Sequence, residues 1–372
     1  MERRRHVLFL IPTLAAGGAE RVAVTLLNHI DRSKFRLSLA VVNARGAVFS
    51  KEVPDDVEFL DLQVSRVRYA LPRLIRLIWR MRPDVVFSAL GHLNLALSII
   101  RPMLPSRTQY VARESIVVSE LHPAYNFPRA WDWAYRTFYG RFDDVICQSE
   151  DMRNDLARNY NIPMQKLRLI NNPVDIEKIA RLASLPTGAC YDCNPESEDV
   201  IRLVAAGRLV HQKGFDLLIE AIALSGLKQL RVTVLGDGPL RGALEELAKE
   251  KGVENQIRFI GFQENPYAFM ARADALVLSS RYEGFPNAVL EALACGTPVI
   301  ATPAPGGVGE IARSTRGVHL AAAVSAEALS TALLAFAGRS NAAQITVEHY
   351  RVGKIAREYE SIFISGARVP GV

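Results

Sequence analysis

Two carboxylates stand eight residues apart in the segment 281–302 (RYEGFPNAVLEALACGTPVIAT), at Glu283 and Glu291. An apolar run at 275–280 predicts a strand that ends just before Glu283, and Glu291 falls within a predicted helix at about 288–296. Open α/β sheets bind ligands at the carboxyl ends of their strands. Ionised carboxylates only accept hydrogen bonds, and a helix N-terminus attracts anions. The spacing therefore predicts a site for a ligand that carries both hydroxyls and an anionic group, as a nucleotide sugar does.

Two cations are expected at the same edge of the sheet. The segment 207–222 (GRLVHQKGFDLLIEAI) follows a predicted strand that ends at Arg208, and its helix is predicted to start after Lys213. Arginine offers a planar fork of donors and lysine a point charge, so two phosphates could bridge them. A solvated basic loop is the alternative that the residues leave open.

Glycines mark two further strand-to-helix connections. Gly17 and Gly18 lie in PTLAAGGAER, where a helix is predicted to start, so backbone could approach a ligand there; a tight turn is the alternative. The segment 235–247 (LGDGPLRGALEEL) contains G-x-G, but Arg241 stands where a dinucleotide motif needs its third glycine. A turn with Pro239 near the first helical position is the simpler interpretation.

Strand and helix signals alternate along the chain, which indicates an α/β fold with parallel sheets. The predicted strands of the first half are 6–12, 36–42, 84–89, 108–112, 144–149 and 167–170. The predicted strands of the second half are 200–207, 230–236, 256–261, 275–280, 298–302 and 317–320. Helices are predicted between the latter at about 214–226, 240–252, 266–273, 288–296 and 326–338.

A polar break at 184–199 divides these two blocks, which predicts two doubly wound, Rossmann-like domains that face a cleft. The expected organisation is a first domain at 1–185, a linker at 186–199 and a second domain at 200–345. The remaining 346–372 holds a helix that is expected to cross back to the first domain.

Composition excludes several other classes. The chain of 372 residues is 49% hydrophobic, but no apolar stretch reaches the 18 or so residues of a membrane span. The basic and apolar start resembles a signal peptide, yet its short apolar run favours a strand followed by a loop. Cys190 and Cys193 are a lone pair in the polar break, so a solvated loop is favoured over a metal or redox site. Cys147 and Cys295 lie in apolar runs, and a reducing cytoplasm is the expected compartment.

Positive charge is concentrated in the first half. Residues 1–190 hold 27 Lys and Arg against 19 Asp and Glu, whereas residues 191–372 hold 18 against 20. The segment 66–83 (RVRYALPRLIRLIWRMRP) has six arginines and no acid, which is typical of a helix on an anionic membrane surface. An ordinary helix with one core face is the alternative. The aromatic segment 127–142 (FPRAWDWAYRTFYGRF) could line a lipid or acceptor surface, or belong to the core.

At this point the motifs identify a family. The chain resembles the retaining GT-B glycosyltransferases of family four over nearly its whole length. The resemblance is carried by GGAER, GRLVHQKGFDLLIEA, LGDGPL, IRFIGF and EGFPNAVLEALACGTPVIAT, in this order. No D-x-D occurs, which removes the usual carboxylate pair of metal-dependent transferases. The resemblance implies two Rossmann-like domains, a nucleotide-sugar donor, and no required metal or cofactor.

The resemblance also assigns expected roles. Gly17 and Gly18 would approach the donor diphosphate, and Arg208 and Lys213 would hold its phosphates and stabilise the leaving group. Glu283 would meet hydroxyls of the donor sugar, and Glu291 would accept from both ribose hydroxyls. The remaining donor contacts, made largely by backbone, are expected at Gly238, Arg258, Gly261, Gly284, Phe285, Pro286, Asn287 and Ala288.

One departure concerns the first domain. Many relatives place a histidine after the strand that corresponds to 108–112, where this chain has Arg113 and Glu114. These two residues are candidates for contact with the sugar or the acceptor, and so is His92, for which a structural role is equally open. Asn172, in NNPVD, matches a family asparagine near the domain junction.

The expected function is transfer, with retention of configuration, of a hexose or N-acetylhexosamine from a nucleotide sugar, most simply UDP-linked. The residues of these motifs resemble those of bacterial enzymes that assemble glycans on polyprenyl-diphosphate carriers. The basic first half suits such an acceptor at the inner membrane face. No nucleic-acid partner is expected. Two rivals stay open: a sugar-nucleotide epimerase on the same fold, and a non-catalytic protein that binds nucleotide sugars.

Overall fold

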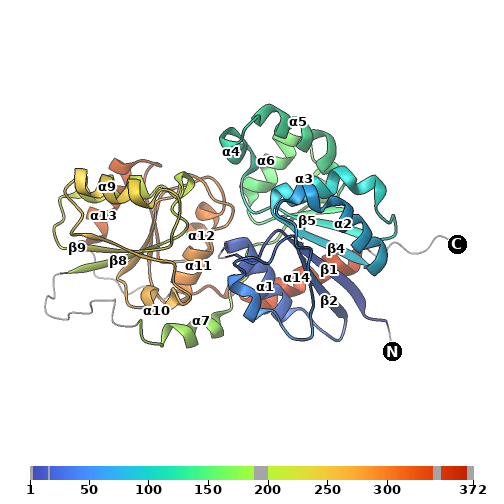
Figure 1. Cartoon of the computed structure of the whole chain (residues 1–372). Helices are drawn as coiled ribbons and strands as arrows, with labels where there is room; N and C mark the ends of the chain where they lie inside the picture. The colour runs from blue at the N-terminus through green and yellow to red at the C-terminus, as the bar shows by residue number, and fades with distance from the viewer. Residues whose placement is uncertain (1–2, 16, 188–199, 338–344, 367–372) are drawn as a thin grey trace. The chain divides into compact units, whose positions relative to one another are not determined.

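The computed structural model describes residues 3–15, 17–187, 200–337 and 345–366. The chain divides into two compact units: Met1–Pro173 together with Tyr350–Val372, and Val174–His349. Each unit is built on one parallel sheet with helices on both faces (Figure 1).

The first sheet has the strand order β3-β2-β1-β4-β5-β6-β7, and all of its pairs are parallel. Its strands are β1 (Arg5–Ile11), β2 (Phe35–Val41), β3 (Glu58–Asp61), β4 (Val85–Ala89), β5 (Gln109–Arg113), β6 (Asp144–Cys147) and β7 (Leu167–Leu169). The order reverses between β1 and β4, so loops that follow these two strands flank the point where doubly wound sheets bind ligands.

Alternation along β1 explains why this sheet is buried on both faces. Val7, Phe9 and Ile11 belong to one core cluster, and Leu8 and Leu10 belong to the other. Successive side chains of a strand point to opposite faces, so an unbroken apolar run fills both cores.

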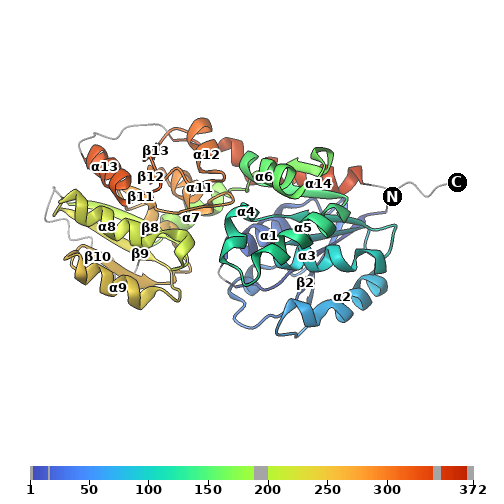
Figure 2. The same cartoon turned by 90° about the horizontal axis from the view of Figure 1, so that it is seen from above.

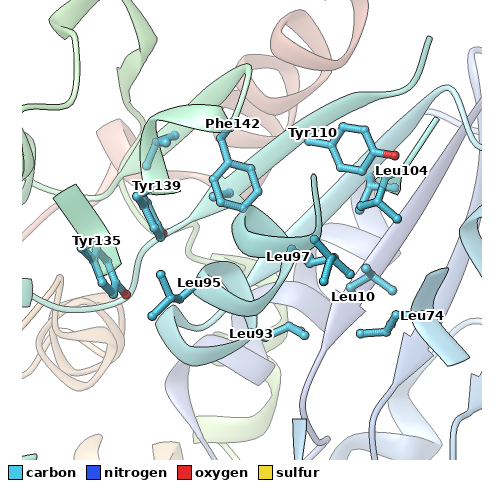
Figure 3. Close-up of a cluster of buried hydrophobic side chains, with 14 of the residues drawn as sticks. Leu10, Leu74, Leu93, Leu95, Leu97, Leu104, Tyr110, Tyr135, Tyr139 and Phe142 are labelled. Atoms are coloured by element: carbon cyan, nitrogen blue, oxygen red, sulfur yellow. The ribbon is translucent and has the colours of Figure 1, made fainter. Parts of the chain in front are cut away.

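Helices supply the other half of each core. The first core is completed by helices α1 (Gly18–His29) and α14 (Val352–Ser365), which pack together. The second is completed by α2 (Val67–Met81), α3 (Gly91–Ile100), α5 (Pro128–Phe138) and α6 (Glu150–Tyr160), beside the short α4 (Val118–Leu121). Figure 3 shows this second cluster, in which Tyr135 and Tyr139 lie near leucines of α3.

The second sheet repeats the same winding, with the order β10-β9-β8-β11-β12-β13 and parallel pairs throughout. Its strands are β8 (Ile201–Ala206), β9 (Leu230–Leu235), β10 (Ile257–Gly261), β11 (Ala275–Leu278), β12 (Val299–Ala301) and β13 (Val318–Leu320). Its helices are α7 (Ile176–Ala183), α8 (Phe215–Ser225), α9 (Arg241–Glu250), α10 (Tyr267–Met270), α11 (Asn287–Ala294), α12 (Val308–Ser314) and α13 (Ala326–Ala337). Figure 2 shows α8 beside α13, and the order reverses between β8 and β11.

The boundary between the units differs from the sequence-based boundary at 185. The first unit ends at Pro173, because α7 packs against α10 and α11 of the second unit. The side chain of Asn265 donates to the carbonyl of Leu182 at 2.8 Å, which fixes the end of α7 there. The predicted linker lies for the most part outside the described residues, as do Cys190 and Cys193.

Neither the strand β3 nor the helix α12 was predicted from the sequence. The strand β3 lies at the edge of its sheet, and its residues are exposed or half-buried, so it has no apolar run to reveal it. The helix α12 is short and buries only Val308 and Ile311. Within the described residues, no helix combines the length and hydropathy that crossing a bilayer requires.

Candidate functional site

The loops that follow β8 and β11 come together at the switch point of the second sheet. The Lys213 Nζ donates to Oε1 of Glu283 at 2.6 Å, and the hydroxyl of Ser280 donates to the same oxygen at 2.6 Å. The side chain of Glu283 is only 6% exposed, whereas that of Lys213 is 23% exposed. Two of the residues predicted from the sequence therefore form a charge-assisted hydrogen bond at this edge of the sheet.

Two glycines permit this approach. Gly214 follows Lys213 with φ of +59°, and a Cβ there would lie 2.1 Å from the carbonyl oxygen of Ser279. Gly306, with φ of +117°, lies as close to the backbone of Glu283, where a Cβ would come within 2.3 Å of its carbonyl oxygen. Glycine tolerates both the positive φ and the close contact. The backbone thus holds Lys213 and Glu283 on facing segments.

Arg208 lies beyond the end of β8 and is exposed. In the part of the chain that the structure describes, its side chain makes no hydrogen bond or ion pair. A guanidinium without a protein partner beside a paired lysine is an arrangement that suits an anionic ligand.

Glu291 lies in α11, the helix that follows the turn containing Glu283. The hydroxyl of Tyr267 lies 3.5 Å from Oε1 of Glu291, and Cys295 follows one turn later. Burial, together with the nearby Glu291, raises the pKa of Cys295 to about 12, so its thiol stays neutral. The structure therefore pairs Glu283 with Lys213 and Glu291 with Tyr267, and neither pairing was predicted from the sequence.

Most of the other donor-binding residues predicted in the second unit lie at the same edge of its sheet, whereas Arg258 lies near the amino end of β10. Pro286 precedes α11, so Asn287 and Ala288 open its first turn, while Gly284 and Phe285 are buried just before it. Gly238 packs against the backbone of Leu209, next to Arg208. Arg258 and Gly261 lie on β10, whose register with β9 shifts between Phe259 and Gly261.

The glycine loop of the first unit contains an acid that the sequence interpretation did not use. Gly17 precedes α1, and Gly18 is the first residue of that helix. A Cβ on Gly17 would lie 2.1 Å from Oε2 of Glu20, and Thr13 donates to Oε1 of Glu20 at 3.3 Å. A carboxylate therefore already occupies the N-terminus of α1, where it is stabilised by the helix dipole.

Arg113 and Asn172 are brought together, but both are buried. The guanidinium of Arg113 donates to Oδ1 of Asn172 at 2.6 Å and to the hydroxyl of Tyr359 at 3.1 Å. Arg113 is 2% exposed and Asn172 is 3% exposed. These contacts tie β5 to α14 and to the end of the first unit, so the two buried residues brace the fold.

Glu114 is buried as well, within a network that the sequence did not reveal. Its carboxylate accepts from the amide of Asn94 at 3.4 Å, from the hydroxyl of Tyr135 at 3.2 Å and from the hydroxyl of Tyr139. Burial raises the pKa of Glu114 above its ordinary value, although the hydrogen bonds oppose that shift. The aromatic segment that holds these tyrosines also leaves Trp133 exposed, so it is core on one face only.

His92 is the exposed member of the first-unit candidates. It is the second residue of α3, and the preceding Leu90 has φ of +82°, a left-handed conformation that leucine rarely adopts. Desolvation lowers the pKa of His92 although part of its surface remains exposed. Backbone strain of this kind often accompanies functional positions.

Comparison with known proteins gives independent evidence for the family of this chain. The family model "Glycosyltransferase Family 4" matches residues 16–178, and "Glycosyl transferases group 1" matches residues 193–346. The lipopolysaccharide core biosynthesis glycosyltransferase LpsE of Rhizobium meliloti is 31% identical over 301 residues, which is 78% of this chain and 77% of that protein. An N-acetylgalactosamine-N,N'-diacetylbacillosaminyl-diphospho-undecaprenol 4-alpha-N-acetylgalactosaminyltransferase of Campylobacter jejuni is 28% identical over 317 residues, 81% of each chain.

Solved structures share the fold across both units. A glycosyltransferase of Rickettsia africae aligns with a TM-score of 0.75 at 15% identity, covering 99% of this chain and 100% of the other. HepE of Anabaena, solved with UDP-glucose, aligns with a TM-score of 0.72 at 17% identity, covering 97% and 99%. At such identities the likeness concerns the fold alone.

Proposed function

Because this chain belongs to the family-four glycosyltransferases, which are retaining hexosyltransferases of the GT-B fold, we propose that it transfers a hexose or N-acetylhexosamine from a UDP-linked donor. The proposed acceptor is a glycan carried on polyprenyl diphosphate. The proposed setting is the synthesis of a cell-surface polysaccharide or a glycoprotein glycan in the cytoplasm, at the inner face of the membrane.

The observation that carries the proposal is the hydrogen bond between Lys213 and Glu283, together with the exposed Arg208, whose side chain has no hydrogen bond or ion pair among the described residues. An ammonium has three donors, and Glu283 engages one of them, so Lys213 can also meet a phosphate oxygen. Departure of a nucleoside diphosphate develops negative charge, which the two cations would stabilise more strongly in the transition state than in the ground state. Glu283 is placed to accept from hydroxyls of the donor sugar.

In this scheme the acceptor hydroxyl attacks from the face that the diphosphate leaves, and its proton passes to the departing phosphate. The anomeric configuration is then retained without a nucleophile from the enzyme. The charge that a metal would neutralise elsewhere is assigned here to Arg208 and Lys213, and the lack of any D-x-D supports that assignment.

The rest of the donor is assigned along the same edge. Glu291 would accept from the ribose hydroxyls, and the backbone around Arg258 and Gly261 would frame the base. The first turn of α11, preceded by Gly284 and Phe285, would face the sugar and its phosphate, because a helix N-terminus favours an anion. Gly238, which has no side chain, would let the backbone near Leu209 approach the donor phosphates closely.

The acceptor assignment rests on His92 and on similarity. Among the candidates for acceptor contact, His92 is exposed. The buried Arg113, Glu114 and Asn172 would contribute indirectly, by holding the carboxyl end of β5 in place. The name of the Campylobacter jejuni relative specifies a diphospho-undecaprenol acceptor, which supports a polyprenyl-diphosphate carrier for this chain.

The membrane part of the proposal rests on α2 and its flanks. Leu74, Leu77 and Ile78 face the core. The exposed face carries Arg66, Arg68, Arg73, Arg76, Arg80 and Arg82. None of the six forms an ion pair with an acid among the described residues, and Trp79 is 50% exposed between them. A basic helix with an exposed tryptophan suits an anionic lipid surface.

The direct test is a thermal-shift screen with UDP, GDP and ADP and then with their sugar conjugates, on the wild type and on Glu291→Ala. A ligand that binds only the folded state raises the midpoint, so the panel ranks affinities. The proposal expects the largest rise with one UDP-sugar and a smaller rise in the variant. No response to any nucleotide would reject it, and turnover of a UDP-sugar without acceptor would favour an epimerase.

A further inference from the structure

Arg281 lies in the turn between β11 and Glu283. Its Nη1 and Nη2 donate to the two carboxylate oxygens of Asp216, at 2.7 and 2.5 Å. Nη1 also donates to the carbonyl of His211 at 3.0 Å, and the backbone N–H of Arg281 donates to the carbonyl of Gln212 at 2.8 Å. One residue of the acidic turn therefore reaches three residues on the lysine side of the site.

Other bonds cross between the same two segments. The hydroxyl of Ser279 donates to the carbonyl of Lys213 at 3.0 Å, and the amide of Gln212 donates to the carbonyl of Tyr282 at 3.0 Å. The contact between Lys213 and Glu283 is a further bond between these two segments. The geometry between cation and carboxylate thus depends on how firmly the two segments are joined.

Asp216 is well placed to hold the guanidinium. It lies in the first turn of α8, where an acid is stabilised by the helix dipole. Partial burial opposes its ionisation, but the hydrogen bond and the attraction of Arg281 outweigh burial and hold the pKa of Asp216 below its ordinary value. The planar fork of arginine meets both carboxylate oxygens at once, which a lysine cannot do.

We infer that Arg281, held by Asp216, is a positioning residue that joins the segment carrying Lys213 to the turn carrying Glu283. The joint itself follows from contacts within the second unit. Its effect on turnover rests on the proposed function, because only in that reaction do Lys213 and Glu283 meet the donor.

The first measurement needs no ligand. Backbone hydrogen exchange of the full-length protein is compared for the wild type, Arg281→Gln, Arg281→Lys and Asp216→Asn. Exchange in 207–214 and in 279–284 is expected to accelerate together, about tenfold in Arg281→Gln and less in Arg281→Lys, because opening free energy falls when a charged hydrogen bond is lost.

Arg272→Gln is the matched control. Arg272 is also half-buried, and its Nη1 donates to the carbonyls of Ala268 at 2.7 Å and Ala183 at 3.2 Å. It precedes β11, at the opposite end of the strand from Glu283, so its loss should leave exchange in both segments unchanged. Unchanged exchange in Arg281→Gln or, if that variant does not fold, in Asp216→Asn would overturn the inference.

Steady-state kinetics with UDP-sugar and acceptor give the second readout. Arg281→Gln should lower kcat about tenfold or more, with partial recovery in Arg281→Lys, and the double variant with Asp216→Asn should lose no more than either single variant. Faster exchange with unchanged kcat would overturn the positioning role. If exchange is faster in Arg281→Gln but the wild type transfers no sugar, the proposed function is rejected. The structural link between the two segments is then still supported.

Discussion

Lys213 and Glu283 are in contact, with 2.6 Å between Nζ and Oε1, although 70 residues separate them in the chain. The carboxylate holds the ammonium in place and offsets part of its charge. Arg208 lies exposed at the same edge, and its side chain has no carboxylate partner within the described part of the chain. The two cations are thus expected to differ in role, with Lys213 fixed in position and Arg208 supplying the stronger field.

Loss of the Lys213 charge should act mainly on turnover. In Lys213→Met we expect kcat to fall about 10²–10³-fold, because a preorganised electrostatic contact to the leaving group is removed. Initial rates of sugar transfer give the measurement. Lys249→Met is a suitable control, since Lys249 also pairs with a glutamate, Glu246 at 2.8 Å, but is exposed on α9. A variant with wild-type kcat would exclude Lys213 from the reaction.

Glu114 should make stability depend on pH. Burial raises its pKa in the folded state above the ordinary 4.5, so the folded protein binds this proton more tightly than the unfolded chain. Its contribution to stability is fully present below pH 4.5 and is lost as the pH rises through the folded pKa. In Glu114→Gln, which keeps an acceptor for Tyr135 and Tyr139, this loss should disappear. Thermal midpoints across the pH range compare the two proteins, and parallel curves would contradict the prediction.

The exposed face of α2 should bind anionic lipid. We expect vesicles that contain phosphatidylglycerol to retain the wild type at low salt and to release it at high salt. Each arginine near such a surface contributes about 1 kcal/mol, so Arg76→Gln with Arg80→Gln should weaken retention more than tenfold. Arg45→Gln with Arg158→Gln removes two exposed arginines elsewhere in the first unit and should have little effect. If the wild type itself is not retained at low salt, the membrane proposal is wrong.

Chelation should leave the reaction intact. Because Arg208 and Lys213 are assigned the charge of the leaving diphosphate, transfer measured with excess EDTA should proceed at the untreated rate. Addition of Mg²⁺ or Mn²⁺ after chelation should give no stimulation. A rate that collapses with EDTA and returns with a divalent cation would require a metal in place of this assignment.

The amino-acid sequence by itself determined the class of fold and the edge of the sheet that carries the site. Strands such as β1 and β4 are continuous apolar runs, and such runs are stable only when a sheet is covered on both faces. The spacing of Glu283 and Glu291 around a strand, a turn and a helix placed both at a carboxyl end. These are local signals, set by burial and by the propensities of neighbouring residues.

Only the tertiary structure decided which side chains meet. Arg113 donates to Tyr359, 246 residues away, and is buried by that contact, whereas the local sequence made it a candidate for a ligand. The partner of Arg281 on α8 and the carboxylate of Glu20 beside Gly17 were equally absent from any local pattern. A hydrogen bond or ion pair depends on distance and direction to within about an ångström. Packing of distant elements sets those quantities, and residue order along the chain does not.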